Sequence, residues 1–252
     1  MAEKIGEIRE KFRLCSDSGL QQLIDCYRED PRSGVRSLIE SAQKRILALE
    51  AERERIETMR VYEKQYGDCG LICGIDEVGR GPLAGPVVAG AVILPADCRI
   101  LYLNDSKKLS AKKREELYGE ICREAVSVGI GCVGPERIDE INILQATYEA
   151  MRQAIGKLDP QPDILLNDAV TIPGVPIRQV PIIRGDAKSV SIAAASIVAK
   201  VTRDRMMEEY DSVYPEYGFA ANKGYGAQAH IDAIKKYGPS PIHRRSFLTH
   251  FL

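Results

Sequence analysis

The chain has 252 residues, of which 44% are apolar and 28% are charged, and its 35 Lys and Arg residues against 36 Asp and Glu residues give a net charge of −1. This composition is typical of a globular protein and excludes a disordered or collagen-like chain. No apolar run approaches the roughly 18 residues that span a membrane, and the N-terminus lacks the apolar stretch of a secretory signal. We therefore expect a soluble, cytoplasmic protein with no membrane partner.

Residues 1–67 are predicted to form a helical module. Apolar residues recur at steps of three and four along three stretches, and breaks at 16–19 and 30–34 separate these stretches. No strand pattern occurs here. The module is expected to end at about residue 67, where the character of the sequence changes.

Residues 68–252 have the pattern of a mixed α/β sheet with flanking helices. Strands are predicted at 71–78, 86–94, 129–133, 163–168 and 177–183. Helices are predicted at 111–126, 141–158, 189–210 and 227–238. The helix at 189–210 is apolar or small almost all round in its first half, which predicts that it is buried against other elements.

Carboxylates stand at the ends of three of these apolar strands. Asp76 and Glu77 end the first, Asp168 ends another, and Asp186 follows the last. Singly, each has an ordinary structural explanation, since Asp186 could cap the following helix and Asp168 could belong to a turn. If the strand ends meet, however, four carboxylates would repel one another and would bind cations, and oxygen ligands suit Mg²⁺ or Mn²⁺. Two such ions can support phosphodiester hydrolysis.

Two competing types of chemistry fit the sequence less well. Gly79, Gly81 and Ala84 formally match a dinucleotide-binding fingerprint, but prolines and a β-branched run follow where that motif requires a helix. A ribonuclease that uses the ribose 2′-OH as its nucleophile commonly needs histidine as acid and base. The three histidines all lie at position 230 or beyond, which favours metal-activated water instead.

Basic residues gather in two parts of the chain despite the neutral total. The two groups are Lys107, Lys108, Lys112, Lys113 and Arg114, and Lys223, Lys235, Lys236, Arg244 and Arg245. Either group could be a solvated surface, or together they could follow a phosphate backbone. Tyr225 lies between two glycines and could stack on a sugar or base, or simply pack within its loop.

Several ordered motifs closely resemble ribonuclease HII. These are GIDEVGRGPLAGPVVAGAVIL, NDSKKLS, LLND, RGDAKS, AAASIVAKVTRDR, YGF, NKGYG and HRRSF, and they cover about residues 70–250. The resemblance implies a ribonuclease H-like fold with a C-terminal helical region. It also implies metal-dependent endonucleolytic cleavage of RNA in RNA–DNA hybrids, including cleavage 5′ of single ribonucleotides embedded in duplex DNA, which leaves 3′-OH and 5′-phosphate ends.

The resemblance also implies roles for individual residues. Asp76, Glu77, Asp168 and Asp186 match the four metal-binding catalytic acids. Residues Gly79, Arg80 and Gly81, here called the GRG segment, match the part that senses the ribonucleotide, whose 2′-OH distinguishes RNA from DNA. Tyr225 matches a tyrosine that packs on the sugar at the ribo–deoxyribo junction, and Lys107 and Ser191 match possible phosphate contacts.

Some features remain open at this stage. Asn222 occupies a position where many relatives have histidine, so a role for that side chain is in doubt. The helical module could contact the duplex or a partner, and the C-terminal SFLTHFL could dock a sliding clamp or be a plain amphipathic end. A ribonuclease HIII-like nuclease and a non-catalytic hybrid-binding protein are the alternative functions.

Overall fold

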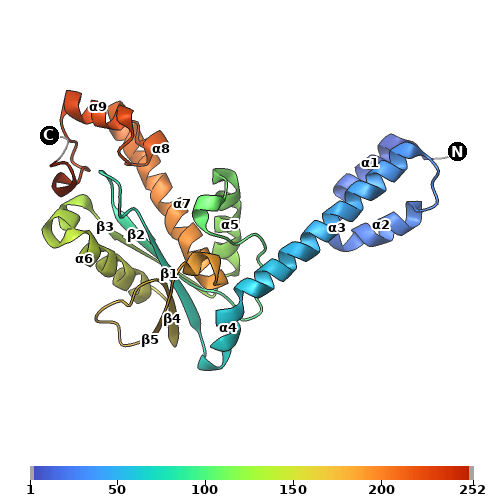
Figure 1. Ribbon diagram of the computed structural model, residues 1–252, viewed down its shortest axis with the longest axis horizontal. Helices are drawn as coiled ribbons and strands as arrows, with labels where there is room; N and C mark the ends of the chain where they lie inside the picture. Colours follow the sequence, from blue (N-terminus) through green and yellow to red (C-terminus); the bar gives the residue numbers. More distant parts are fainter. Residues whose placement is uncertain (1–2, 250–252) are drawn as a thin grey trace. The chain divides into compact units, whose positions relative to one another are not determined.

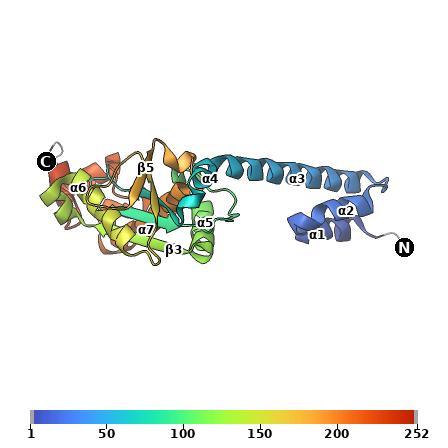
Figure 2. The ribbon, with the colours of Figure 1, turned by 90° about the horizontal axis from the view of Figure 1, so that it is seen from below.

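The computed structural model describes residues 3–249, which fall into two compact units, Met1–Glu57 and Thr58–Leu252. The first unit is helical, as predicted. Helices α1 (Ile5–Leu14) and α2 (Leu20–Tyr27) lie along the first part of the long helix α3 (Ser33–Met59) (Figures 1 and 2). Their shared apolar core contains Ile8, Phe12, Leu20, Ile24, Val35 and Ala42. The three- and four-residue spacing of these side chains places them on facing helix surfaces.

The second unit is built on a five-stranded mixed sheet in the order β3-β2-β1-β4-β5. The strands are β1 (Ile72–Val78), β2 (Val87–Ile93), β3 (Ser127–Val133), β4 (Ile164–Asp168) and β5 (Arg178–Ile182). Strand β1 is antiparallel to β2 and parallel to β4, while β4 is parallel to β5. All five predicted strands and the mixed α/β class are confirmed.

Helices cover both faces of this sheet (Figure 1). Helix α6 (Pro135–Gly156) packs on one face of β2 and β3, and α7 (Val190–Val213) packs on the other face, across β1 and β2, with α5 (Ala111–Glu124) beside it. Glycines allow this close packing: a Cβ added at Gly131 would lie 1.8 Å from the Ala150 carbonyl oxygen, and one at Gly74 would lie 2.0 Å from the Ser191 backbone. The burial predicted for the small-residue helix is confirmed, because α7 is buried along its first half.

The remaining helices are short and frame the sheet. Helix α4 (Val61–Gln65) precedes β1, while α8 (Phe219–Asn222) and α9 (Gln228–Tyr237) form the predicted C-terminal helical region around a separate apolar core. Short 3₁₀ helices connect the elements at η1 (Asp17–Gly19), η2 (Gly67–Cys69), η3 (Ser106–Lys108), η4 (Gly185–Ala187), η5 (Pro215–Tyr217) and η6 (Arg245–Phe247). Helix α6 is interrupted at Asn142, whose side chain accepts hydrogen bonds from the next turn.

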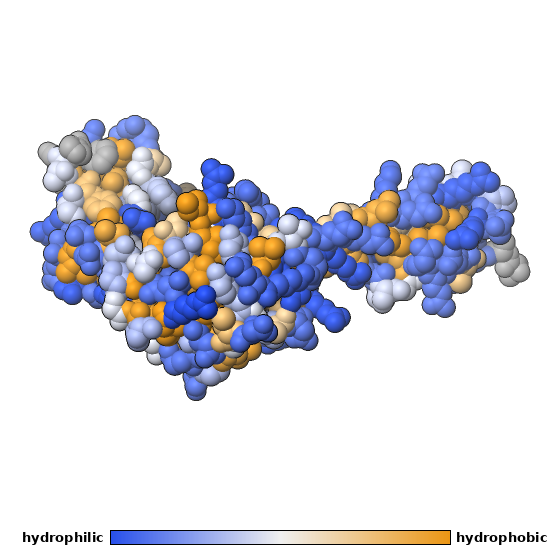
Figure 3. All heavy atoms as spheres, turned by 60° about the horizontal axis from the view of Figure 1, so that its bottom comes forward, coloured by the Kyte–Doolittle hydropathy of each residue, from blue (hydrophilic) through white to orange (hydrophobic). Residues whose placement is uncertain are grey.

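Hydrophilic residues surround separate apolar patches on the face of the molecule shown in Figure 3. Large exposed apolar side chains come from different elements, including Leu144 in α6, Ile183 after β5 and Val213 at the end of α7. Within residues 3–249, no helix is both long and apolar enough to cross a bilayer. Residues 250–252, which include the end of the proposed clamp-docking segment, lie outside the described part of the chain.

Candidate active site

The four predicted acids lie where β1 and β4 end and where η4 begins. In the parallel pairing of β1 with β4, Ile75 is opposite Asn167, so the next residues along the two strands are Asp76 and Asp168. The strand β1 continues through both of its acids, since Glu77 still pairs with Ala89. The strand ends at Val78, as predicted, so Asp76 and Glu77 are its last residues but two and one.

Asp76 is the most enclosed of the four acids, with a side chain that is 7% exposed. Its carboxylate accepts a hydrogen bond from the backbone N–H of Glu77 at 2.7 Å, and the Ser196 hydroxyl of α7, which donates to Ser106, lies beside it and lowers its pKa. Burial raises the pKa of Asp76 well above its usual range, and the neighbouring charges of Glu77 and Asp168 raise this pKa further. Ionising Asp76 in this site therefore costs free energy.

Asp168 is the acid that joins the other three electrostatically. Its charge raises the pKa of Asp76, of Glu77 and of Asp186. Burial is the larger cause at each of these three groups, and the nearby Arg80 partly offsets the effect at Glu77. The Asp168 carboxylate itself accepts a hydrogen bond from the Gly185 N–H at 2.7 Å, which ties η4 to the end of β4. The structure thus brings the four predicted acids into one electrostatic group, here called the acid site.

Asp186 lies within η4 and does not cap α7. The cap of α7 is Ser189, whose hydroxyl accepts a hydrogen bond from the Ile192 N–H at 3.2 Å. The alternative explanation of Asp186 as a helix cap is therefore wrong. Burial raises the pKa of Asp186, and the charges of Asp105, in the loop before η3, and of Asp168 raise it further.

Lys107 contributes positive charge to the same place. It lies in η3, is exposed, and lowers the pKa of both Glu77 and Asp186, although burial and like charges outweigh it there. The backbone N–H of Lys107 donates to the Asp105 carboxylate at 2.9 Å, which fixes the turn that carries the lysine. The structure thus places this predicted phosphate contact beside the acid site.

The donor chemistry of the acid site suits a hard divalent cation. All four side chains offer carboxylate oxygens, and their mutual repulsion is what a bound cation would relieve. Within residues 3–249, no three Asp, Glu, His or Cys side chains are grouped like the ligands of a metal ion. Asp76 and Asp168 each accept a hydrogen bond from a nearby backbone N–H.

The GRG segment and Tyr225 lie side by side next to the acid site. A Cβ added at Gly81 would lie 3.9 Å from Cε1 of Tyr225, and the tyrosine side chain is 46% exposed. The Arg80 side chain is 44% exposed and reaches Glu77 at 3.5 Å. The loop of Tyr225 is held by Asn222, whose side chain donates to the Tyr217 carbonyl and accepts from the Gly224 N–H, each at 2.7 Å. Asn222 therefore has a structural role.

Two buried arginines support the loop that follows the GRG segment. Arg203 donates to the carbonyls of Ala84, Pro86 and Lys223, and Arg244 donates to those of Gly79, Arg80 and Gly85. Both side chains are fully buried, so Arg244 does not belong to an exposed phosphate-binding surface. Lys223 is also engaged, since its ammonium lies 2.7 Å from Glu208. The predicted C-terminal basic surface is thus reduced to the exposed Lys235, Lys236 and Arg245.

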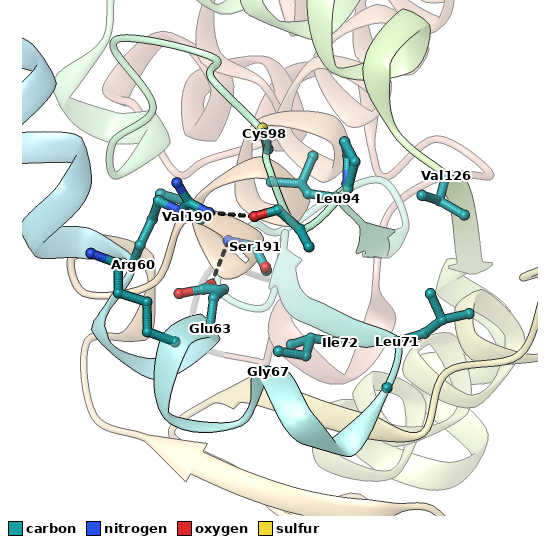
Figure 4. A pocket seen from close by; sticks show the side chains of 14 residues that line it. Arg60, Glu63, Gly67, Leu71, Ile72, Leu94, Cys98, Val126, Val190 and Ser191 are labelled. Atoms are coloured by element: carbon teal, nitrogen blue, oxygen red, sulfur yellow. Dashed lines mark hydrogen bonds between the residues drawn. The ribbon is translucent and has the colours of Figure 1, made fainter.

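Ser191 is in a different part of the molecule. It is 1% exposed, and its backbone N–H donates to Glu63 of α4 at 3.0 Å. Together they line a cavity of about 490 Å³ at the beginning of β1, beside Leu71 and Ile72 and at the opposite end of that strand from its acids (Figure 4). The prediction of a phosphate contact for Ser191 is not supported, because its side chain has no exposed surface to offer.

The comparisons with known proteins agree with this geometry. Residues 73–250 match the family model described as Ribonuclease HII, and residues 4–67 match that of the Ribonuclease HII N-terminal domain. A curated relative from Lachnoclostridium phytofermentans, named Ribonuclease HII, is 63% identical over 245 residues, covering 97% of this chain and 96% of the relative. The chain belongs to the ribonuclease HII family.

Solved structures show the same fold. The ribonuclease H2 of Pyrococcus horikoshii superimposes with a TM-score of 0.60 at 30% identity, covering 70% of this chain and 93% of that one. A ribonuclease HII from Archaeoglobus fulgidus, solved in complex with PCNA, has a TM-score of 0.58 at 28% identity and covers 69% and 94% of the two chains. The ribonuclease H-like architecture is therefore confirmed, and the chain is an endoribonuclease that acts on RNA–DNA hybrids.

Sequence reasoning missed three polar residues that complete the acid site. The hydroxyls of Ser196 and Ser106 are hydrogen-bonded at 3.0 Å, and both residues are buried behind Asp76. Asp105 adds a fifth carboxylate close to Asp186. All three belong to motifs that the family resemblance includes, NDSKKLS and AAASIVAK, but their roles depend on how η3 and α7 meet in space. Serines in a small-residue helix give no signal of that contact.

Proposed function

We propose that the chain cleaves the phosphodiester on the 5′ side of a ribonucleotide, in long hybrids and at single ribonucleotides within duplex DNA, leaving 3′-OH and 5′-phosphate ends. The observation that carries the proposal is the electrostatic coupling of Asp168 with the three other acids, beside an exposed tyrosine that faces the GRG segment. On this proposal, the nuclease site and the sugar-recognition site would be adjacent.

Asp76, Glu77, Asp168 and Asp186 would hold the divalent metal ions on which enzymes of the ribonuclease H type depend. Bound Mg²⁺ or Mn²⁺ would supply Lewis-acid stabilisation of the charge that develops on the phosphate oxygens. The protein's own groups orient these ligands. Ser196 and the Glu77 N–H fix Asp76, and the Gly185 N–H fixes Asp168, so that the carboxylates face the same strand end.

Recognition of the substrate would use the neighbouring elements. Backbone groups of the GRG segment can contact a ribose 2′-OH, and the exposed Arg80 guanidinium can contact the adjacent phosphate. The half-exposed ring of Tyr225 can pack on the next sugar, while Lys107 balances charge on the phosphate side. These contacts would select the ribo–deoxyribo junction.

The decisive assay uses a labelled duplex with one ribonucleotide and follows cleavage with Mg²⁺ or Mn²⁺ and then with EDTA. We expect one cut on the 5′ side of the ribonucleotide, with a 3′-OH end, and no cut in EDTA. A cut that persists in EDTA, or a 2′,3′-cyclic phosphate product, would refute the proposal. The same duplex without its ribonucleotide is the control.

Two partner surfaces belong to this proposal as well. The helical module, predicted as residues 1–67, would contact either the duplex or a partner protein. Removing residues 1–57 and measuring how the affinity for a hybrid depends on salt distinguishes these two roles. An unchanged affinity and salt slope would reject the duplex contact. A sliding clamp at the C-terminal segment is the further candidate, tested by pull-down with and without residues 246–252.

A further inference from the structure

A single buried segment touches both elements that read the substrate. Residues 242–244 run beside the loop that follows the GRG segment: the Gly85 N–H donates to the Ile242 carbonyl, and the Arg244 N–H donates to the Leu83 carbonyl. From this segment the Arg244 guanidinium donates to the Gly79 carbonyl at 2.5 Å and to the Arg80 carbonyl at 2.9 Å. The backbone of the GRG segment is thus held from beneath by one side chain.

The neighbouring residue, His243, points toward Tyr225 through a second histidine. Nε2 of His243 lies 3.0 Å from Nε2 of His230 in α9, and Nδ1 of His230 lies 2.8 Å from the Tyr225 carbonyl oxygen. At the other end, the Ser240 N–H lies 2.9 Å from Nδ1 of His243. The chain of contacts runs without interruption from the backbone of Ser240 to the backbone of Tyr225.

The two ends of this chain fix the protons within it. A backbone N–H can only donate, so Nδ1 of His243 is the acceptor and its proton is on Nε2. A carbonyl can only accept, so Nδ1 of His230 carries a proton and its Nε2 accepts from His243. Each ring is therefore neutral with one defined tautomer, and an added proton would place two N–H groups face to face.

The environment of the pair supports this neutral arrangement. His230 is 0% exposed and His243 is 3% exposed, and the rings of Tyr217 and Phe219 pack against both. Burial lowers the pKa of each histidine, and for His243 the neighbouring histidine lowers it further. The pair has no exposed surface with which to contact a substrate, so its effect must pass through the groups it holds.

The backbone of the Tyr225 loop is also hydrogen-bonded directly to the loop that follows the GRG segment. The Leu83 N–H donates to the Gly224 carbonyl at 2.8 Å, and a Cβ added at Gly224 would lie 2.4 Å from the Ala84 carbonyl oxygen. A side chain at Gly224 would therefore push the loop of Tyr225 away from the loop that follows the GRG segment. The spacing between Tyr225 and the GRG segment is therefore set by these direct backbone contacts and by the side chains of His230, His243 and Arg244.

We propose that His230, His243 and Arg244 are positioning residues that hold Tyr225 and the GRG segment at the fixed spacing needed to read two adjacent nucleotides. The histidines act on the Tyr225 carbonyl, and Arg244 acts on the carbonyls of Gly79 and Arg80. This inference rests on the proposed function, because it assumes that these two elements contact the ribo–deoxyribo junction. It assigns the selectivity for the junction to groups that never touch the substrate.

The test compares His230→Asn with His230→Leu. Asparagine places an amide nitrogen where histidine has Nδ1 and can still donate to the Tyr225 carbonyl, whereas leucine cannot. We expect His230→Leu to raise KM for the single-ribonucleotide duplex about tenfold, with a smaller effect on a uniform hybrid, and His230→Asn to recover most of this loss. Tyr237→Phe, on the exposed surface of the same helix, is the matched control and is expected to leave the kinetics unchanged.

A double-mutant cycle with Tyr225→Ala distinguishes positioning from general damage. If His230 acts through Tyr225, His230→Leu has little further effect once Tyr225 is alanine. Additive losses, equal losses on both substrates or no rescue by asparagine would overturn the inference. The affinities of the same variants for uncut duplex are also measured in EDTA. Because binding selectivity is measured even if the wild-type chain does not cleave, a failure of this inference can be distinguished from a failure of the proposed function.

The tautomers provide a test that needs no substrate. The chain has only three histidines, so ¹⁵N long-range NMR spectra of the wild-type protein at pH 7 resolve each ring. We expect the Nδ1–H tautomer at His230 and the Nε2–H tautomer at His243. A different or averaged tautomer at either ring would contradict the contact chain, and a spectrum in which His230→Leu leaves His243 unchanged would contradict their coupling.

Discussion

The acid site and the arginine-supported loop next to it hold like charges in opposite ways. In the acid site, burial raises the pKa of Asp76, Glu77 and Asp186, and the charge of Asp168 raises each of these pKa values further. Beneath the GRG segment, Arg203 and Arg244 are also buried close together, and burial followed by repulsion from Arg203 lowers the pKa of Arg244 to about 9. The GRG segment lies between the acid site and the two buried arginines.

The difference lies in the partners of the two groups. The guanidiniums of Arg203 and Arg244 donate to backbone carbonyls, so these cations are hydrogen-bonded and tied to the fold. The carboxylates receive few protein donors and retain repulsion that a cation can remove. Like charges whose hydrogen bonds are all made to the protein have a structural role, whereas like charges that lack such partners are available to bind a ligand.

The largest expected effect comes from removing the central charge of the acid site. Asp168→Asn keeps an oxygen that can accept from the Gly185 N–H but loses the negative charge, so we expect the cleavage rate to fall by about 10³-fold or more while hybrid affinity is retained. Asp163→Asn, at the other end of β4, is the matched control because an amide oxygen can still accept from the Leu71 N–H. Wild-type cleavage by Asp168→Asn would remove this residue from the site.

The arginine-supported loop is tested by Arg244→Met. This change leaves buried carbonyls without donors, so we expect the free energy of unfolding to fall by about 3 kcal/mol. Arg244→Lys restores the charge but not the forked contacts and should recover only part of the loss. The exposed neighbour Arg245→Met should change stability by less than about 0.5 kcal/mol. Equal effects of the two methionine variants would show that Arg244 has no special structural role.

The histidine pair beside Arg244 predicts a dependence of stability on pH. Burial, with the charge of His230, lowers the pKa of His243 to about 4, below its usual 6.5, so the unfolded chain binds the proton more readily. The stabilisation is therefore complete above about pH 6.5 and is lost as the pH falls toward 4, by roughly 3 kcal/mol. Urea unfolding between pH 5 and 7 measures this slope, which should flatten in His243→Asn. An identical slope in the variant would contradict the assignment.

The smallest effect concerns a carboxylate outside the acid site that does have donors. Glu63 accepts from the Ser189 hydroxyl at 2.5 Å and from the Ser191 N–H at 3.0 Å, and so supports the start of α7. We expect Glu63→Ala to lower the unfolding free energy by about 1 kcal/mol and Glu63→Gln to lower it less. Gln65→Ala, exposed on the same helix, should have no measurable effect. If both alanine variants behave alike, the Glu63 contacts contribute nothing.

Most of the fold follows from local patterns in the sequence. The five strands and most long helices appear within a few residues of their predicted bounds, because alternation and helical spacing are local consequences of which face is buried; α6 begins at Pro135, six residues before its predicted start. The break of α6 at Asn142 was not predictable from helical spacing, since it depends on the Asn142 side chain accepting hydrogen bonds from the next turn.

The candidate site was predictable where a strand end or a family motif placed a residue, and not where packing decides. The four acids come together as expected, yet the phosphate contact predicted for Ser191 fails because α7 is pressed against Gly74, which buries that serine. Conversely, Ser196 lies one turn further along and reaches Asp76. Arg244 resembles a surface cation in sequence, and only the packing of residues 242–244 beside the loop shows it to be buried.

The central claim is that the carboxylates of the acid site repel one another until a divalent cation relieves them. The most direct measurement is the thermal unfolding of the wild type and Asp168→Asn, with Mg²⁺ or Mn²⁺ added to metal-free protein. We expect the metal to raise the wild-type Tm by about 5 °C at 100-fold excess over Kd, and Asp168→Asn to unfold at a higher temperature than wild type without metal and to gain little from it. Equal metal-induced shifts in both proteins, or a lower metal-free Tm in the variant, would contradict the account.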